Sequence, residues 1–339
     1  MAQGINRQVT LASYPQGEPV LTNFAAVETP VPEPGAGQLL LRNKYLSLDP
    51  YMRGRMSTMR SYAKGFEIGH ALGGGTISEV VASNNPNFAP GDIVLAAGGW
   101  QDYALSGGEG LVRIDPALAP VTTALGVLGM PGMTAYTGLV NIGTPKPGET
   151  VVVAAAAGPV GATVGQIAKI MGCRTVGIAA EHKLDYLREE LGFDAALDRR
   201  SPELKEELRE ACPLGIDVYF ENVGGAVWEA VAQLLNDFAR VPVCGLIAHY
   251  NETQLPPGPD RMSLLMRLIL TRRLRIQGFI VSDFAAQRGD FLRDVSAWFR
   301  EGKIKYREDI VEGLERAPEA FIKLLRGDGF GKMIVKIAD

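Results

Sequence analysis

A glycine-containing segment in the middle of the chain has the spacing of a dinucleotide-binding turn. Residues 150–156 form a continuous apolar run typical of a buried strand, and residues 160–171 have apolar positions at helical spacing. The turn between them has Ala156 where the usual fingerprint has its first glycine. Gly158 would let the backbone approach a pyrophosphate held at the helix N-terminus, and Gly161 would let helix and strand pack closely. A purely structural turn is the alternative. The residues expected to bind the cofactor here are Gly158, Pro159, Val160 and Gly161.

The end of the next predicted strand, residues 173–179, indicates which nicotinamide cofactor to expect. Residues 177–180 contain no carboxylate that could accept hydrogen bonds from the ribose hydroxyls of NAD. Lys183 follows closely, and Arg199 and Arg200 lie in an adjacent loop. Cations at this place favour a ribose 2′-phosphate, so we expect NADP(H). The alternative is that Lys183 and Arg199 are solvated surface charges.

The pattern of elements around this turn predicts two domains. Short apolar runs separated by Pro/Gly turns make residues 1–125 β-rich, which suggests an irregular barrel or sandwich. From residue 126 strands alternate with helices, which predicts a doubly wound parallel sheet over residues 126–289. Residues 290–339 would return to the first domain. The later elements expected are helices at 182–191, 202–211, 228–235, 261–270, 284–300 and 317–325, and strands at 195–197, 216–220, 239–245, 274–281 and 333–337.

Composition excludes several functional classes. The net charge of −4 provides no general attraction for nucleic acid or an anionic membrane. Three widely spaced cysteines form neither a disulfide framework nor a four-thiolate zinc lobe. The first residues lack the apolar core of a signal peptide, and the uncharged stretches 116–145 and 150–168 do not read as membrane spans. We therefore expect a cytoplasmic protein.

Seven segments distributed along nearly the whole chain resemble the zinc-free medium-chain dehydrogenase/reductases. The likeness is to the branch of prostaglandin reductases and plant alkenal double-bond reductases, and most of all to its bacterial NADPH-dependent curcumin reductases. The resemblance implies a Rossmann-type domain and a β-rich, GroES-like, partly open barrel domain. The matching segments are residues 47–56 (SLDPYMRGRM), 129–139 (GMPGMTAYTGL), 155–161 (AAAGPVG), 220–225 (FENVGG), 243–251 (VCGLIAHYN), 255–261 (LPPGPDR) and 276–280 (IQGFI).

The ligands of a catalytic zinc are missing from the corresponding positions. Zinc-dependent relatives have a cysteine at the start of the segment that here begins with Ser47, and a glutamate after the histidine that here is His70. A catalytic zinc needs about three protein ligands, so we expect no metal. His70, His182 and His249 are interpreted as structural side chains.

Without a metal, tyrosine hydroxyls are the expected catalytic groups. The resemblance points to Tyr250, which follows a predicted strand, and to Tyr51 in the first matching segment. A phenol can stabilise an oxyanion by hydrogen bonding and can relay a proton. Either side chain could instead be a packed aromatic whose hydroxyl bonds to the backbone.

The resemblance also implies further cofactor contacts outside the glycine turn. One position departs from the branch, because Gly329 stands where an asparagine usually contacts the cofactor, and this puts one hydrogen bond in doubt. The additional contacts implied are Met133, Thr134, Asn222, Cys244, Gly245, Tyr250, Phe279, Val281 and the position of Gly329.

Together these expectations describe an NADPH-dependent reductase of activated carbon–carbon double bonds in small hydrophobic enones and enals. A zinc-free quinone reductase and a non-catalytic NADPH-binding structural protein are the alternatives. Residues 274–281 should form the edge of the nucleotide sheet and contain no proline. An exposed edge invites pairing with another chain, and the resemblance implies a homodimer; a monomer with this edge covered by residues 284–300 is the alternative.

Overall fold

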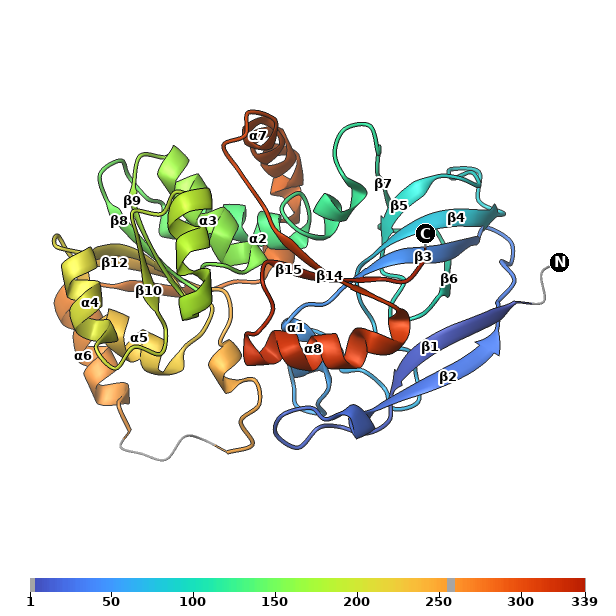
Figure 1. The fold of residues 1–339 in the computed structure, drawn as a ribbon, viewed down its shortest axis with the longest axis horizontal. Coiled ribbons are helices and arrows are strands. Elements are labelled where there is room, and N and C mark those ends of the chain that lie inside the picture. Colours follow the sequence, from blue (N-terminus) through green and yellow to red (C-terminus); the bar gives the residue numbers. More distant parts are fainter. Residues whose placement is uncertain (1–3, 255–259, 339) are drawn as a thin grey trace. The chain divides into compact units, whose positions relative to one another are not determined.

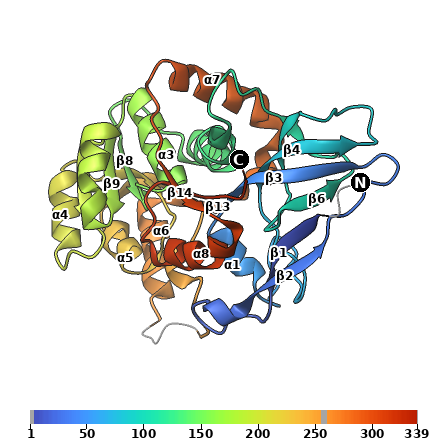
Figure 2. The same cartoon turned by 45° about the vertical axis from the view of Figure 1, so that its right-hand side comes forward.

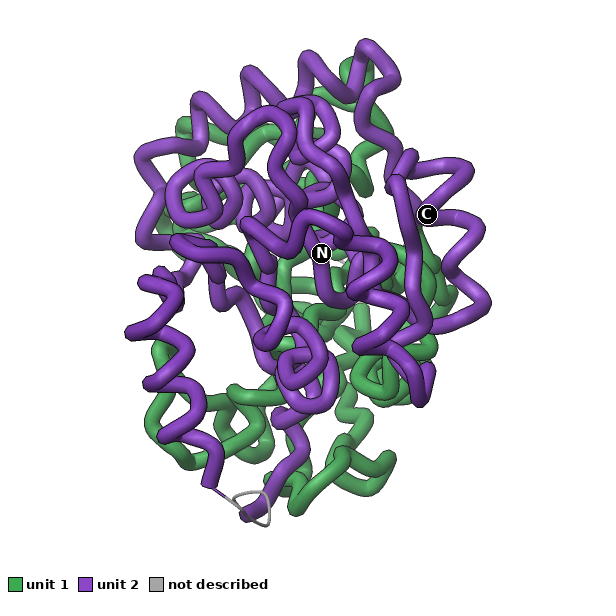
Figure 3. The backbone as a smooth tube through the Cα atoms, turned by 90° about the vertical axis from the view of Figure 1, so that its left-hand side faces the viewer, with its two compact units in different colours: residues 1–126, 308–339 green, residues 127–307 purple. Residues whose placement is uncertain are grey.

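The computed structural model describes residues 4–254 and 260–338. Its contacts divide the chain into two compact units, residues 1–126 with 308–339 and residues 127–307 (Figure 3). The second division lies at residue 307 rather than 289, because helix α7 (Arg288–Arg300) packs on helix α2 (Met130–Gly138). The Tyr136 hydroxyl donates to Asp294 Oδ2 at 2.7 Å. Residues 255–259, part of one segment that carries the family resemblance, lie outside the described residues.

The second unit is built on a six-stranded parallel sheet with the order β10-β9-β8-β11-β12-β13 (Figure 1). This order starts in the middle and proceeds first to one edge and then to the other, which confirms the doubly wound fold. All five residues of β8 are buried, as expected of a central strand covered on both faces. The strands are β8 (Thr150–Ala154), β9 (Arg174–Ala179), β10 (Ala195–Asp198), β11 (Ile216–Phe220), β12 (Leu235–Val243) and β13 (Arg275–Gly278).

The helices of this unit differ in places from the sequence expectations. The helix expected at 182–191 is present but irregular, since it begins as a 3₁₀ helix, Glu181–Lys183, and ends as a π-helix, Tyr186–Glu190. The helix expected at 228–235 is α5 (Gly225–Ala232), because Leu235 already pairs with Ile216 in the sheet. The helix expected at 284–300 is α7, and it is preceded by a 3₁₀ helix, Val281–Gln287, within which Phe284 has non-helical backbone angles. The remaining helices are α3 (Pro159–Ile170), α4 (Leu204–Ala211) and α6 (Met262–Arg272), with a π-type turn at Leu139–Gly143.

The first unit contains a mixed sheet with the order β14-β15-β3-β4-β5-β7 (Figure 1). Strand β6 pairs with β3 (Figure 2). This path does not close on itself among the described residues, so the unit has no closed barrel. Its core contains Trp100, stacked on Phe24 and meeting Phe321 edge to face. The elements are β1 (Ile5–Leu11), β2 (Phe24–Pro30), β3 (Leu39–Ser47), α1 (Tyr51–Arg55), β4 (Thr76–Ser83), β5 (Ile93–Ala96), β6 (Tyr103–Ser106), β7 (Val112–Arg113), β14 (Glu308–Glu312), α8 (Ala317–Arg326) and β15 (Lys332–Lys336), with short 3₁₀ turns at Leu21–Asn23, Val121–Leu125 and Leu314–Arg316.

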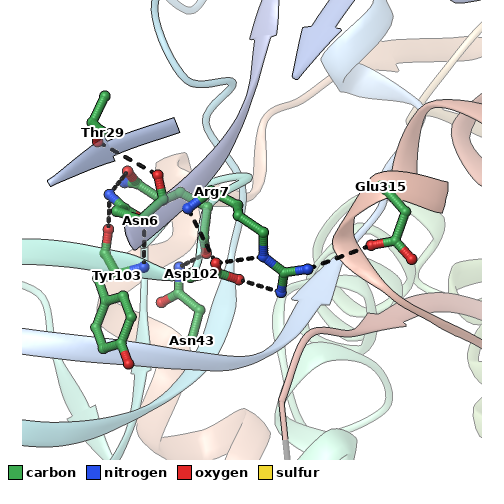
Figure 4. A network of polar contacts seen from close by, with 8 residues as sticks. Asn6, Arg7, Thr29, Asn43, Asp102, Tyr103 and Glu315 are labelled. Carbon is green, nitrogen blue, oxygen red and sulfur yellow. Dashed lines mark hydrogen bonds and ion pairs between the residues drawn. The ribbon is translucent and has the colours of Figure 1, made fainter. Parts of the chain in front are cut away.

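Side chains tie the β1-β2 hairpin to this sheet. The Arg7 guanidinium donates to both carboxylate oxygens of Asp102, at 2.8 and 3.0 Å, and approaches Glu315 at 3.8 Å (Figure 4). Asn6 forms a reciprocal pair with Tyr103, donating from Nδ2 to its carbonyl and accepting from its N–H. These contacts add to the backbone hydrogen bonds from Val9 to Trp100 and from Asp102 to Arg7, and to the burial of Val9, Leu11 and Phe24 in the core of this unit.

Over residues 4–254 and 260–338, no helix combines the length and apolar composition that crossing a membrane requires.

Candidate active site

The candidate site lies at the carboxyl ends of the strands of the parallel sheet in the second unit. Because the strands are parallel, the segments that follow their carboxyl ends meet at the same edge. The sequence-predicted residues follow six different strands there: Gly158, Pro159, Val160 and Gly161 after β8, Lys183 after β9, Arg199 after β10, Asn222 after β11, Cys244, Gly245 and Tyr250 after β12, and Phe279 and Val281 after β13.

In the turn after β8, the first turn of helix α3 packs closely on the backbone that follows the strand, as the glycine spacing predicts. Gly158 is the N-cap of α3, and Pro159 occupies the first helical position, where its missing N–H costs nothing. A Cβ at Gly161 would lie 2.5 Å from the carbonyl oxygen of Ala155, so only glycine fits without a shift. The left-handed residue of the turn is Ala155, with φ of 51°, one position before the alanine that replaces the first glycine. Helix N–H groups of the first turn lack partners within the helix and suit an anionic phosphate.

Two cations stand beside the carboxyl end of β9. Lys183 ends the 3₁₀ turn that follows this strand, and its side chain is 6% exposed. Arg199 directly follows β10, and its backbone N–H donates to the carbonyl of Ala179, the last residue of β9, at 2.8 Å. The structure thus brings Arg199 to the end of the strand that precedes Lys183.

Asn222 and the following loop are organised by Glu221, which the sequence reasoning missed. The Asn222 side-chain amide donates to the carbonyl of Ala154 at 2.8 Å, joining the ends of β11 and β8. The Glu221 carboxylate, 2% exposed, accepts hydrogen bonds from the N–H groups of Val223 and Gly224 and from the Tyr219 hydroxyl. Burial raises the pKa of Glu221 despite these donors. The FENVGG segment was the signal available in the sequence, but it did not reveal this carboxylate's role.

The loop after β12 places a tyrosine hydroxyl over the end of the strand. The N–H groups of Cys244 and Gly245 both donate to the carbonyl of Glu221, at 2.9 and 3.2 Å. A Cβ at Gly245 would lie 3.1 Å from Tyr250 Oη, so the phenol lies directly against this glycine. Burial raises the pKa of the Cys244 thiol to about 12, with a further contribution from Glu221. A raised pKa keeps this thiol in its neutral form, which does not favour a role as a nucleophile.

Four other residues that the resemblance links to the cofactor lie in the same unit. Met133 and Thr134 are buried in α2, where the Thr134 hydroxyl donates to the carbonyl of Met130 at 2.8 Å. Phe279 is buried between the rings of Phe220 and Phe284, with centroid distances of 6.2 and 6.1 Å. Val281 begins the next 3₁₀ turn.

Tyr51 and Gly329 belong to the first unit. Tyr51 is the first residue of α1, and its hydroxyl has a pKa above the usual value, chiefly because of burial and secondarily because of the Asp49 carboxylate. Gly329 lies in the segment between α8 and β15, and a Cβ there would approach Met333 Cε at 3.0 Å.

The loop before Tyr51 is held by a buried ion pair that the sequence did not reveal. Lys332 is 2% exposed, and its Nζ donates to Asp49 Oδ1 at 3.0 Å and to the carbonyl of Leu48 at 2.7 Å. The other oxygen of Asp49 accepts a hydrogen bond from Ser47 Oγ. Burial lowers the pKa of Lys332, and Asp49 opposes that shift.

Within the described residues, no three His, Cys, Asp or Glu side chains are grouped so that they could hold a metal ion. The side chain of His70 is 73% exposed and lies 3.9 Å from Glu67.

Comparisons with known proteins place the chain in a family. Residues 7–114 match the family described as the N-terminal domain of oxidoreductase, and residues 159–299 match the one described as zinc-binding dehydrogenase. The chain is 54% identical to the NADPH-dependent curcumin reductase of Escherichia coli K12 over 335 residues, which cover 98% of this chain and 97% of that protein. It is 42% identical to prostaglandin reductase 1 of Rattus norvegicus over 96% of this chain and 98% of the relative.

A solved structure is similar to this chain both in sequence and in fold. The crystal structure of CurA from Vibrio vulnificus in complex with NADPH superposes with a TM-score of 0.95 at 51% identity, covering 98% of this chain and 99% of that one. The chain therefore belongs to the medium-chain dehydrogenase/reductase family of oxidoreductases, in the branch of the curcumin and prostaglandin reductases.

Proposed function

We propose that this protein reduces the activated carbon–carbon double bond of α,β-unsaturated ketones and aldehydes with NADPH. The observation that carries the proposal is the position of the Tyr250 hydroxyl against Gly245. Both residues follow the carboxyl end of β12, on the same side of the sheet as the turn between β8 and α3 (residues 155–161, the phosphate turn). The relatives support the cofactor, since one is named an NADPH-dependent reductase and another was crystallised with NADPH.

The residues at this edge fit an NADP cofactor. Gly161 gives the turn its close approach to Ala155, and the α3 N-terminus presents N–H groups to a pyrophosphate. Lys183 and Arg199 supply positive charge for the 2′-phosphate that distinguishes NADP from NAD. When bound, the cofactor supplies a hydride to the β-carbon of the substrate.

The protein's part in the reaction is to stabilise the charge that develops on the substrate. As the β-carbon is reduced, negative charge moves to the carbonyl oxygen, and the Tyr250 hydroxyl would donate a hydrogen bond to that oxygen. Tyr51 is the second candidate donor, and its raised pKa keeps the phenol protonated across the neutral and mildly alkaline range. The enolate then takes a proton at its α-carbon to give the saturated ketone.

Product identity is the deciding measurement. Purified protein is mixed with NADPH and either a simple enone or a benzoquinone, and the products are separated by mass. We expect NADPH oxidation with the enone and a saturated ketone as product. Turnover of the quinone alone would identify a quinone reductase, and turnover of neither with tight NADPH binding would leave a binding protein.

Substitution of the two tyrosines assigns their roles. Tyr250→Phe should lower kcat by about 10²-fold, the lower end of what a positioned donor contributes, with NADPH affinity nearly unchanged. Tyr51→Phe tests the second phenol in the same way. Tyr103→Phe is the matched control, because Tyr103 lies in β6 of the first unit and is not among the expected site residues. This variant should retain full activity.

A further inference from the structure

The side chain of His249, adjacent to Tyr250, links two loops at the edge of the nucleotide sheet. Its Nε2 lies 3.2 Å from the backbone nitrogen of Gly225, and the N–H of Gly225 points at it. Its Nδ1 lies 2.9 Å from Glu252 Oε1. The ring therefore joins the first residue of α5 to the loop after β12.

These two contacts define the state of the imidazole. A backbone N–H can only donate, so Nε2 must carry a lone pair and no proton. The remaining proton of a neutral ring then lies on Nδ1, where it donates to the Glu252 carboxylate. The charged groups that face the ring are Glu252 and, further away, the buried Glu221. A protonated ring would direct an N–H at the Gly225 N–H and at the positive end of the α5 dipole.

The contact also satisfies a specific need of α5. The first N–H groups of a helix have no partner within the helix, and the N-cap residue here is Gly224, which has no side chain to supply one. His249 supplies that acceptor from a different loop. The backbone continues the same connection, because Ile247 N–H donates to the Asn222 carbonyl and Ala248 N–H to the Val223 carbonyl.

We propose that His249, as the neutral tautomer protonated on Nδ1, is a positioning residue for Tyr250. It fixes the loop that carries the phenol against the loop that carries Asn222, and Glu252 orients the ring. The inference rests on the proposed function for the role of Tyr250, whereas the tautomer and the contact with Gly225 do not depend on it.

Two conservative substitutions separate the two ring nitrogens. In His249→Gln the side-chain amide can still offer an oxygen near the position of Nε2, so the acceptor for Gly225 is kept. In His249→Asn the shorter amide reaches only the position of Nδ1, so the contact with Glu252 is kept and the acceptor is lost. His70→Gln, at an exposed histidine of the first unit, is the control for histidine removal in general.

We expect His249→Asn to lower kcat for enone reduction by about fivefold, the usual effect of one lost hydrogen bond. Its KM for the enone should change less than twofold, and His249→Gln should keep kcat within about twofold of the wild type. Equal losses in both variants, no loss in His249→Asn, or a change confined to KM would overturn the positioning role.

A second measurement does not use the reaction. Nitrogen-15 NMR of histidine-labelled holoenzyme at pH 8 should show one neutral histidine protonated on Nδ1, and this signal should disappear in His249→Gln. A signal for His249 protonated on Nε2 would overturn the assignment. If the wild type reduces no enone, the proposed function fails, and the NMR result still decides the tautomer.

Discussion

At the scale of single residues, Lys183 and Arg199 should decide between the two nicotinamide cofactors. A charge-assisted hydrogen bond is worth about 1.5–3 kcal/mol, so Lys183→Ala or Arg199→Ala should weaken NADPH binding at least about tenfold and leave NADH binding nearly unchanged. Fluorescence titration of both cofactors measures this. Arg209→Ala, on the exposed face of α4, is the control for loss of a positive charge. Equal affinity of the wild type for NADPH and NADH would contradict the assignment.

At the scale of the elements, two glycines of the phosphate turn should have different functions. Gly161→Ala would place a Cβ 2.5 Å from the Ala155 carbonyl, so the protein should lose about 1–3 kcal/mol of stability through overpacking. Gly158→Ala meets its nearest atom at 3.3 Å, so its stability should change less, while its Cβ would obstruct the pyrophosphate. Thermal unfolding measured without cofactor reports the loss of stability, and titration with NADPH reports the loss of cofactor binding. Equal stability losses would show that both glycines serve packing alone.

The buried pair between β15 and the loop before α1 should be a main support of the first unit. Lys332→Met leaves the Asp49 carboxylate buried without its partner, which should cost about 3–5 kcal/mol. Adding Asp49→Asn removes the unpaired charge and should restore part of that stability. Chemical denaturation measures both variants. A single variant as stable as the wild type would show that Asp49 finds another partner or a proton.

At the scale of the whole molecule, we propose a two-fold dimer formed through β13. The structure confirms that β13 is an edge strand. The neighbouring α6 has no buried residue and exposes Met262, Leu264, Met266 and Leu270, an apolar surface of the kind that marks contact with another chain. A second copy would cover both features across an isologous interface.

Light scattering at micromolar concentration tests this assembly. The wild type should have twice the single-chain mass of 36.4 kDa. Ile276→Pro removes an N–H that faces away from β12, since Gln277 faces β12 in the register of the two strands, and it should shift the mass toward the monomer, while NADPH binding reports whether the variant still folds. A wild-type mass near 36.4 kDa would contradict the dimer.

The class of the fold and the tight turn after β8 could both be predicted from the order of residue types. Apolar strand-like runs that alternate with helix-like segments predicted the parallel sheet, because strands and helices each have their own spacing of apolar residues along the chain. Glycine spacing predicted the turn, since Gly161 has a steric reason that depends only on its neighbours in the chain. The predicted boundaries of elements were less accurate where pairing with a neighbouring strand determines them. Leu235, for example, pairs with Ile216 in the sheet instead of continuing a helix.

The polar groups that hold the loops of the two tyrosines could not be predicted, because they meet only in the folded chain. Lys332 and Asp49 are 283 positions apart, and His249 meets Gly225 across 24. Contacts of this kind follow no period and no motif, because each depends on where separate strands end in space. The lysine reads as a surface charge and the histidine as an isolated side chain until the fold brings a buried carboxylate to one and an unsatisfied helix N–H to the other.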